Sequence, residues 1–89
     1  MKVKDTYILK KVADKHIVVP TKEATLNLNG IITLNETGKF LFECLESETT
    51  IEELTQKMIS NYKIDYEIAK KDILAFVEVL RSKNMLDEA

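Results

Sequence analysis

The fold is decided by the stretch Leu34–Glu43, LNETGKFLFE, which is followed after a short gap by Thr50–Leu54, TIEEL. Asn35 can cap a helix through its side-chain oxygen, and Thr50 with Glu53 has the spacing of a capping box. The apolar, β-branched residues just before this stretch are typical of a strand. The sequence therefore predicts a strand that runs into two capped amphipathic helices. No side chain in the stretch is an obvious catalyst, which favours a binding module over an enzyme.

Upstream of this stretch, the sequence has the pattern of an antiparallel hairpin. Tyr7–Val12 and His16–Val19 are rich in residues that favour strands. Ala13–Lys15 lies between them and has the composition of a turn, and Pro20 is expected to stop the second strand, because proline cannot donate to a ladder of hydrogen bonds.

A third strand is expected at Ile31–Leu34. It is preceded by Leu26–Leu28 and by the pair Asn29-Gly30, which readily supplies the positive φ angles of a tight turn. Leu26–Leu28 is therefore a candidate short partner strand. Neither proline nor charge guards the third strand, so a partner segment can extend its edge unless the N-terminus or Thr25–Leu28 covers it.

Three helical periodicities fill the rest of the chain. The first helix is expected over about Glu36–Leu45, and the second begins after Thr50. A break is expected at Asn61–Ile64. Asp65 can cap the third helix, which should run to about Lys83. The residues expected to face the core are Phe40, Leu41, Cys44, Leu45, Ile51, Leu54, Met58, Ile59, Ala69, Ile73, Phe76, Val77 and Leu80. These elements predict one α+β domain over residues 1–89, winged helix-turn-helix-like, with a three-stranded antiparallel sheet followed by three helices.

The third helix carries more apolar surface than a one-sided core requires. Beside its core stripe runs a second line, which consists of Ile68, Asp72, Ala75 and Val79. At about 100° per residue, the largely apolar arc covers roughly 200° of the helix. Two interpretations remain open: the sheet and the second helix divide the arc between them, or a groove beside the helix accepts apolar side chains of a partner.

Composition and charge exclude several classes of function. Hydrophobic residues make up 45% and charged residues 31% of the 89-residue chain, as in an ordinary globular domain. The net charge of −2 provides no positive field for nucleic acid or anionic lipid. No apolar run approaches the roughly 20 residues that span a bilayer, and no signal peptide is evident, so we expect a cytoplasmic protein.

A winged-helix DNA-binding regulator is the alternative hypothesis. Its third helix would then enter the major groove and present cationic and amide side chains to the bases. The outward face of this helix instead mixes both signs of charge. It carries Glu67, Lys70, Lys71, Glu78, Arg81 and Ser82. We therefore expect no nucleic-acid partner. A third hypothesis is an accessory subunit that dimerises through its sheet edge, which leaves a monomer or weak dimer open.

Catalytic and metal-binding chemistry find little support in the sequence. His16 is the only histidine and has no cysteine or acid pair near it in the sequence, so a partly exposed strand histidine is the favoured interpretation. Cys44, the only cysteine, is expected on the core side of its helix as a small hydrophobic residue. We expect no cofactor, no metal and no catalytic residue.

Four segments carry a resemblance to a known family. They are ITLNETGKFLFECL at 32–45, TIEEL at 50–54, YKID at 62–65 and DILAFVEVL at 72–80. In this order and spacing, the chain resembles the pyrroloquinoline-quinone biosynthesis protein D (PqqD) family over nearly its whole length. The resemblance implies a peptide-recognition element of pathways that make ribosomally synthesised, post-translationally modified peptides. Such an element binds the leader region of a precursor peptide and presents the precursor to a modifying enzyme, often a radical S-adenosylmethionine (radical SAM) protein.

The resemblance also implies a place for the peptide. In the family, the leader lies as an added strand on the third strand of the sheet, against the third helix. Carried onto this sequence, the peptide-binding residues are Ile31, Ile32, Thr33, Leu34, Ile68, Asp72, Ala75, Phe76 and Val79. The family name refers to one redox cofactor, but related elements serve other peptide products, and the sequence favours none of them.

Overall fold

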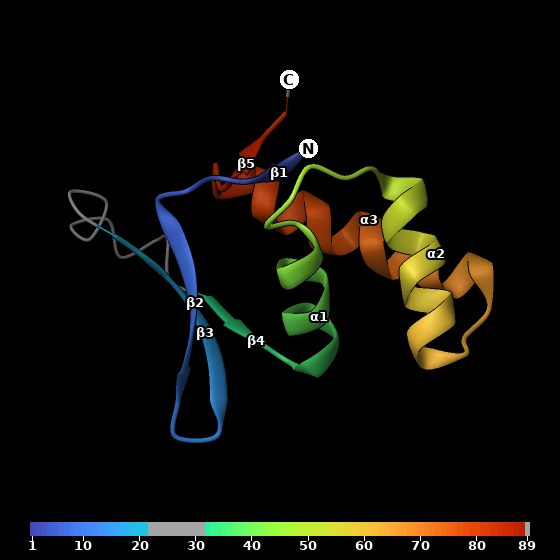
Figure 1. The fold of residues 1–89 in the computed structure, drawn as a ribbon, viewed down its shortest axis with the longest axis horizontal. Coiled ribbons are helices and arrows are strands. Elements are labelled where there is room, and N and C mark those ends of the chain that lie inside the picture. Colours follow the sequence, from blue (N-terminus) through green and yellow to red (C-terminus); the bar gives the residue numbers. More distant parts are fainter. Residues whose placement is uncertain (22–31, 89) are drawn as a thin grey trace.

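A three-stranded antiparallel sheet and three helices dominate the fold, as the sequence predicts (Figure 1). The structure, a computed structural model, describes residues 1–21 and 32–88. The expected strand at Leu26–Leu28, the Asn29-Gly30 turn and Ile31 lie outside the described residues. In the described part, the sheet order is β2-β3-β4.

The predicted hairpin is present. β2 (Tyr7–Val12) pairs with β3 (Lys15–Pro20) in a register that joins Tyr7 to Pro20 and Val12 to Lys15. The turn between them uses a left-handed Ala13 with a φ of 57°. Pro20 is the last residue of β3 rather than the residue after it. This position suits proline, because a strand end loses little when one N–H donor is missing.

β4 (Ile32–Leu34) pairs with β3 through His16–Leu34, Ile17–Thr33 and Val18–Ile32. α1 (Glu36–Cys44) follows directly, and the Asn35 side-chain oxygen accepts a hydrogen bond from the Gly38 N–H at 2.8 Å. This cap turns the chain sharply from the sheet edge into the helix.

The other two helices form a pair. α2 (Ile51–Tyr62) begins with the predicted cap, in which the Thr50 hydroxyl accepts from the Glu53 N–H at 3.1 Å, and it ends at a left-handed Lys63. α3 (Tyr66–Ser82) follows Asp65. Asp65 has the position of an N-cap but its side chain makes no capping hydrogen bond, so the expected side-chain cap is wrong.

The ends of the described chain form a second, two-stranded sheet that the sequence did not predict. β1 (Lys2–Val3) pairs antiparallel with β5 (Leu86–Asp87). Each strand has only two residues, too few for a recognisable alternation of polar and apolar side chains. Because β1 is held by β5, it does not cover the edge of β4.

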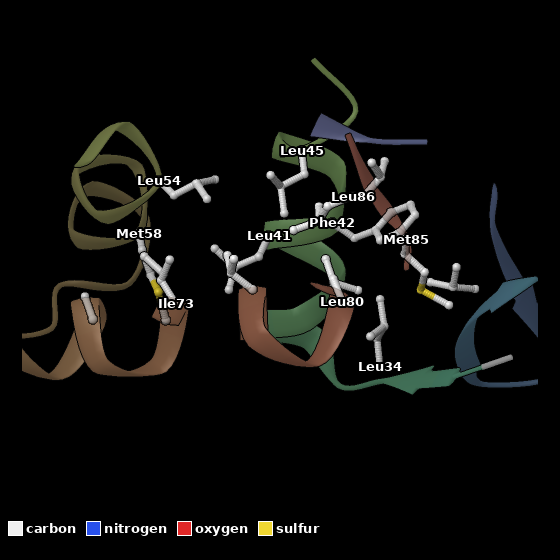
Figure 2. Packing of buried hydrophobic residues seen from close by; sticks show 14 residues of the cluster. Leu34, Leu41, Phe42, Leu45, Leu54, Met58, Ile73, Leu80, Met85 and Leu86 are labelled. Atoms are coloured by element: carbon white, nitrogen blue, oxygen red, sulfur yellow. The ribbon is translucent and has the colours of Figure 1, made fainter. Parts of the chain in front are cut away.

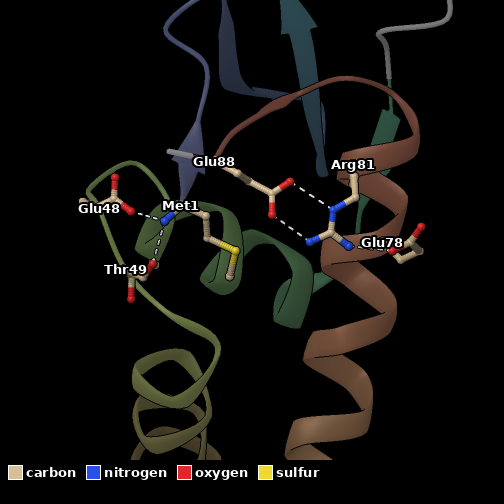
Figure 3. A network of polar contacts seen from close by, with 6 residues as sticks. All are labelled: Met1, Glu48, Thr49, Glu78, Arg81 and Glu88. Atoms are coloured by element: carbon tan, nitrogen blue, oxygen red, sulfur yellow. Dashed lines mark hydrogen bonds and ion pairs between the residues drawn. The ribbon is translucent and has the colours of Figure 1, made fainter.

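Polar contacts fasten these ends to the helices (Figure 3). The Met1 amino group donates to the Glu48 carboxylate and, at 2.9 Å, to the Thr49 carbonyl. Arg81 of α3 donates to Glu88 beyond β5 through two nitrogens, at 3.0 and 2.7 Å. The contacts with Glu48 and Glu88 are exposed, and surface ion pairs of this kind contribute little stability. They therefore position the ends of the described chain more than they stabilise the fold.

The core lies where α1 meets α3 and β5, with α2 packed on the far end of α3 (Figure 2). The prediction that Leu41 and Leu45 face the core is confirmed, and Phe42, which was not predicted to face it, is also fully buried. The other two predicted core residues of α1, Phe40 and Cys44, are only half-buried. The Phe40 ring packs edge-on against Tyr62 with 5.4 Å between ring centroids. The side of α1 that contacts α2 is thus distinct from the side that enters the core.

Candidate functional site

One edge of the main sheet is free among the described residues. β4 pairs with β3, and no described strand pairs with its other edge. In an antiparallel ladder, successive residues direct their N–H and C=O groups alternately to the two sides. Alternate residues of β4 therefore present backbone donors and acceptors away from β3, where a further strand can pair with them.

Two adjoining depressions lie beside this edge. The first, of about 430 Å³, is lined by Ile32, Thr33, Leu34, Asn35, Gly38, Phe76 and Val79. The second, of about 380 Å³, is lined by Asn35, Thr37, Gly38, Leu41, Asp72, Ala75, Phe76 and Val79. Because four residues line both, they form one continuous feature between β4, the start of α1 and α3. We call it the β4–α3 groove.

The first turn of α1 lies between the two walls of the groove, and Gly38 determines how closely it packs. A Cβ atom at Gly38 would lie 3.3 Å from both the Asn35 side-chain oxygen and the Leu34 Cβ, closer than most carbon contacts. The glycine thus allows the end of β4 to lie directly against α1. The atoms closest to this position all belong to side chains.

Side chains from α3 form the opposite wall. Asp72, Phe76 and Val79 succeed one another at helical spacing, so they share one face of the helix. Val79 is 46% exposed and Phe76 is half-buried, so the apolar surface in the groove is open to solvent. The surplus apolar line on this helix is therefore not consumed by packing within the described chain.

The groove contains a single charge. Among the described residues that line it, only Asp72 is ionisable as an acid or base, and the others are apolar or neutral polar. The Asp72 carboxylate is exposed and makes no hydrogen bond or ion pair with any described residue. The groove is therefore mainly apolar, with one unneutralised negative charge at the end away from Val79.

Most of the predicted peptide-binding residues meet at this groove. Ile32, Thr33 and Leu34 line it from the sheet, and Asp72, Ala75, Phe76 and Val79 line it from α3. Ile68 is 54% exposed but lines neither depression, and Ile31 is outside the described residues.

Four lining residues were not predicted from the sequence, and all of them lie in the link between sheet and helix or in α1. They are Asn35, Thr37, Gly38 and Leu41. Their capping and glycine signals were visible in the sequence. Periodicity alone, however, does not show that the first turn of a helix will lie beside an open strand edge.

His16 has a structural role that the sequence did not suggest. It is only 8% exposed rather than partly exposed, and its Nε2 lies 2.9 Å from a carboxylate oxygen of Glu36 at the start of α1. A carboxylate only accepts, so Nε2 donates. This hydrogen bond and the nearby imidazole lower the pKa of Glu36. The pair joins β3 to α1 immediately behind β4.

Other chemistry is sparse in the described residues. Burial raises the pKa of the half-buried Cys44 thiol, which makes it less reactive. No group of three or more His, Cys, Asp or Glu side chains is placed to hold a metal ion in residues 1–21 and 32–88. The same residues include no helix that is long and apolar enough to cross a bilayer.

The outward face of α3 is electrically mixed. Arg81 lies 2.7 Å from Glu78 and 2.7 Å from Glu88, and these carboxylates raise the pKa of its guanidinium. The Lys70 ammonium lies 5.8 Å from the centre of the Tyr66 ring. The cations on this helix thus form no unbroken basic stripe of the kind that phosphate backbones require.

One family model matches the sequence, and solved structures share the fold. The family described as "Coenzyme PQQ synthesis protein D (PqqD)" matches residues 16–86. No curated protein matches the sequence. One similar solved structure, "TbiB1 in Complex with the TbiA(beta) Leader Peptide", has a TM-score of 0.78 and 20% identity and covers 100% of this chain and 98% of that chain. Another, "Lasso peptide synthetase B1 complexed with the leader peptide", has a TM-score of 0.72 and 18% identity and covers 94% of this chain and 93% of the other.

Proposed function

The chain belongs to the PqqD family, and from this premise we propose that it is a non-catalytic module that captures the leader segment of a ribosomally made precursor peptide. The leader binds by β-strand addition to β4 and lies along the β4–α3 groove. The module then presents the precursor to an enzyme that modifies it. The module uses no cofactor of its own, and the encounter takes place in the cytoplasm, where the precursor is synthesised.

One observation carries this proposal: the edge of β4 that no described strand pairs with borders an open apolar groove. The edge supplies main-chain donors and acceptors, which fix the register of an extended peptide whatever its sequence. The groove supplies pockets for the side chains that point toward α3. Strand addition needs both features on the same side of the sheet, and they occur together here.

The expected energetics suit a reversible peptide complex. Each 100 Å² of apolar surface that the leader and the groove bury contributes about 2.5 kcal/mol. Each main-chain hydrogen bond to β4 adds about 1 kcal/mol net. Ordering the peptide opposes these gains. We expect a dissociation constant in the micromolar range or tighter.

The two similar structures support the same assignment. Both were solved with a leader peptide bound, and both share the fold of this chain over nearly its whole length. A module without catalytic machinery needs a separate enzyme for the modification. We propose that this enzyme is a radical SAM protein or, as the alternative, another kind of peptide-modifying enzyme. We also propose that the module acts as a monomer or weak dimer.

The proposal can be tested with a matched pair of variants on α3. Val79 and Leu74 are 46% and 49% exposed, but only Val79 lines the groove. The probes are fluorescent synthetic peptides that cover the N-terminal halves of short reading frames beside this protein's gene. We expect Val79→Asp to weaken binding by about tenfold or more, because the variant loses apolar contact and forces a carboxylate against the peptide.

Leu74→Asp is the control. Its dissociation constant for the same peptide should lie within about twofold of the wild-type value, because such a small change in binding free energy does not indicate a lost contact. Circular dichroism and thermal unfolding should show that both variants keep the fold. A folded Val79→Asp protein that binds with unchanged affinity would exclude the groove from peptide recognition.

A further inference from the structure

We propose that Asp72 makes the groove select a leader strand in which a lysine or arginine lies two residues from an apolar side chain. The inference rests on the proposed function, because it specifies the kind of peptide that the same groove accepts. Three features of the described residues carry it: the isolation of the Asp72 charge, the division of the groove into two halves, and the spacing along α3.

Among residues 1–21 and 32–88, no side chain neutralises the Asp72 carboxylate. On a helix, residues three and four positions away are the side chains that can pair with it. At Asp72 these are Ile68, Ala69, Ala75 and Phe76, and none is charged. The neighbouring Lys70 lies over the Tyr66 ring, and Lys71 lines a separate depression with Leu74. Glu36 and Glu78 have partners, whereas other exposed carboxylates such as Glu46 have none among the described residues; Asp72 differs from Glu46 in that it lines the groove.

The two halves of the groove differ in chemistry. The depression beside β4 is lined by the apolar side chains of Ile32, Leu34, Phe76 and Val79, together with three smaller or polar residues. The adjoining depression shares Asn35, Gly38, Phe76 and Val79 with the first and adds Leu41, Ala75, Thr37 and Asp72, so it differs by containing a carboxylate beside its apolar side chains. The first half suits an aliphatic or aromatic side chain. The second suits a long side chain with a cationic donor group at its tip, because such a group satisfies a carboxylate and neutral oxygens together.

The spacing of the two halves matches an extended strand. Asp72 and Phe76 are one helical turn apart, a rise of about 6 Å. Two residues of a β-strand advance about 6.7 Å and return the side chain to the same face. β4 and α3 slope in the same direction in Figure 1, so a strand paired with β4 runs along α3. An apolar side chain over Phe76 therefore places the side chain two positions away beside Asp72.

The experiment is a display selection of random dodecapeptides against the full chain. Peptides are counted as groove-dependent when the Val79→Asp variant does not retain them. Among groove-dependent peptides, the wild type should enrich lysine or arginine two positions from an apolar residue, and Asp72→Lys should enrich aspartate or glutamate at that position. Glu46→Lys is the control: it makes the same charge change on an exposed residue outside the groove and should reproduce the wild-type preference.

Individual peptides then give the size of the effect. Asp72→Asn should weaken a selected basic peptide about two- to fivefold, and Asp72→Lys about tenfold, the range for an ion pair with partial solvent access. Replacing the peptide's lysine with glutamate should restore affinity for the Asp72→Lys variant. Added salt should weaken the wild-type complex, because ions screen exposed charges.

The outcomes separate this inference from the proposed function. Groove-dependent peptides without a basic preference, or with the same preference for Asp72→Lys and wild type, overturn the role of Asp72 and leave leader capture standing. A selection that yields no groove-dependent peptide overturns leader capture and the Asp72 inference with it.

Discussion

At Gly38, a missing side chain lets the first turn of α1 lie against Leu34, the last residue of β4. Just behind it, His16 and Glu36 join β3 to the same turn. These single residues fix the angle at which the helix leaves the sheet, and so they shape the floor of the groove. Their contribution follows from contacts across segments that are distant in the sequence. For that reason, the burial of His16 and its bond to Glu36 were not predictable from the sequence.

The pair of Glu36 and His16 predicts a dependence of stability on pH. Because the pKa of Glu36 is lowered from 4.5 in the folded protein, its carboxylate stabilises the fold above that value and loses the effect as the pH falls through the lowered pKa. Thermal unfolding of the wild type and of Glu36→Gln measures the difference. At about pH 6 the wild type should melt at the higher temperature, and the gap should close well below pH 4.5. A gap that stays constant down to acid pH would show that the pairing does not stabilise the fold.

The positions of the helices could be predicted from the sequence, because signals between residues close together in the chain determine where a helix begins and ends. Capping residues and apolar periodicity placed the three helices nearly to the residue, since those signals act within a few positions of each other. They failed where tertiary contacts decide. The two-residue strands β1 and β5 form only because the described ends of the chain meet. Phe42 is buried because the core lies on the side of α1 that faces α3 and β5, whereas helical periodicity alone had favoured Phe40.

The helix caps offer a matched prediction at this scale. Asn35 makes a capping hydrogen bond of 2.8 Å, whereas Asp65 occupies the same position before α3 without one. Asn35→Ala should therefore lower the free energy of unfolding by about 1 kcal/mol, and Asp65→Ala by clearly less. Urea denaturation of both variants measures the two losses. Equal losses would mean that the cap of α1 does not hold the turn between β4 and the groove.

For the whole molecule, fold class and family follow from the sequence because the order of many weak signals is distinctive within a short chain. The position of the groove could be predicted from the sequence only in part. The edge strand and the surplus apolar face of α3 were visible, but the start of α1 enters the groove through packing that no local pattern encodes. Ile68 is an example of a residue that was predicted from spacing but is not part of the groove: it shares the helix face with Asp72, yet it lines neither depression. Its part in peptide binding stays a prediction.

The charge of the whole molecule also separates the leading hypothesis from DNA recognition. The net charge is −2, and Arg81 on the outward face of α3 is paired with two carboxylates. A peptide that adds a strand to β4 contacts the opposite, groove-lining face of α3. The two hypotheses therefore predict ligand contacts on different surfaces of α3. A measurement that reports on individual residues distinguishes them.

The most direct test is an amide NMR titration of the chain with leader-region peptides taken from the reading frames beside its gene. Leader capture predicts that the largest shifts fall at Ile31, at 32–34 on the edge of β4 and at 68–79 on the groove side of α3, while β1, β5 and α2 change little. Shifts centred on α2, on the outward face of α3 or on β1 and β5, or no shifts with any neighbouring leader, would contradict the account.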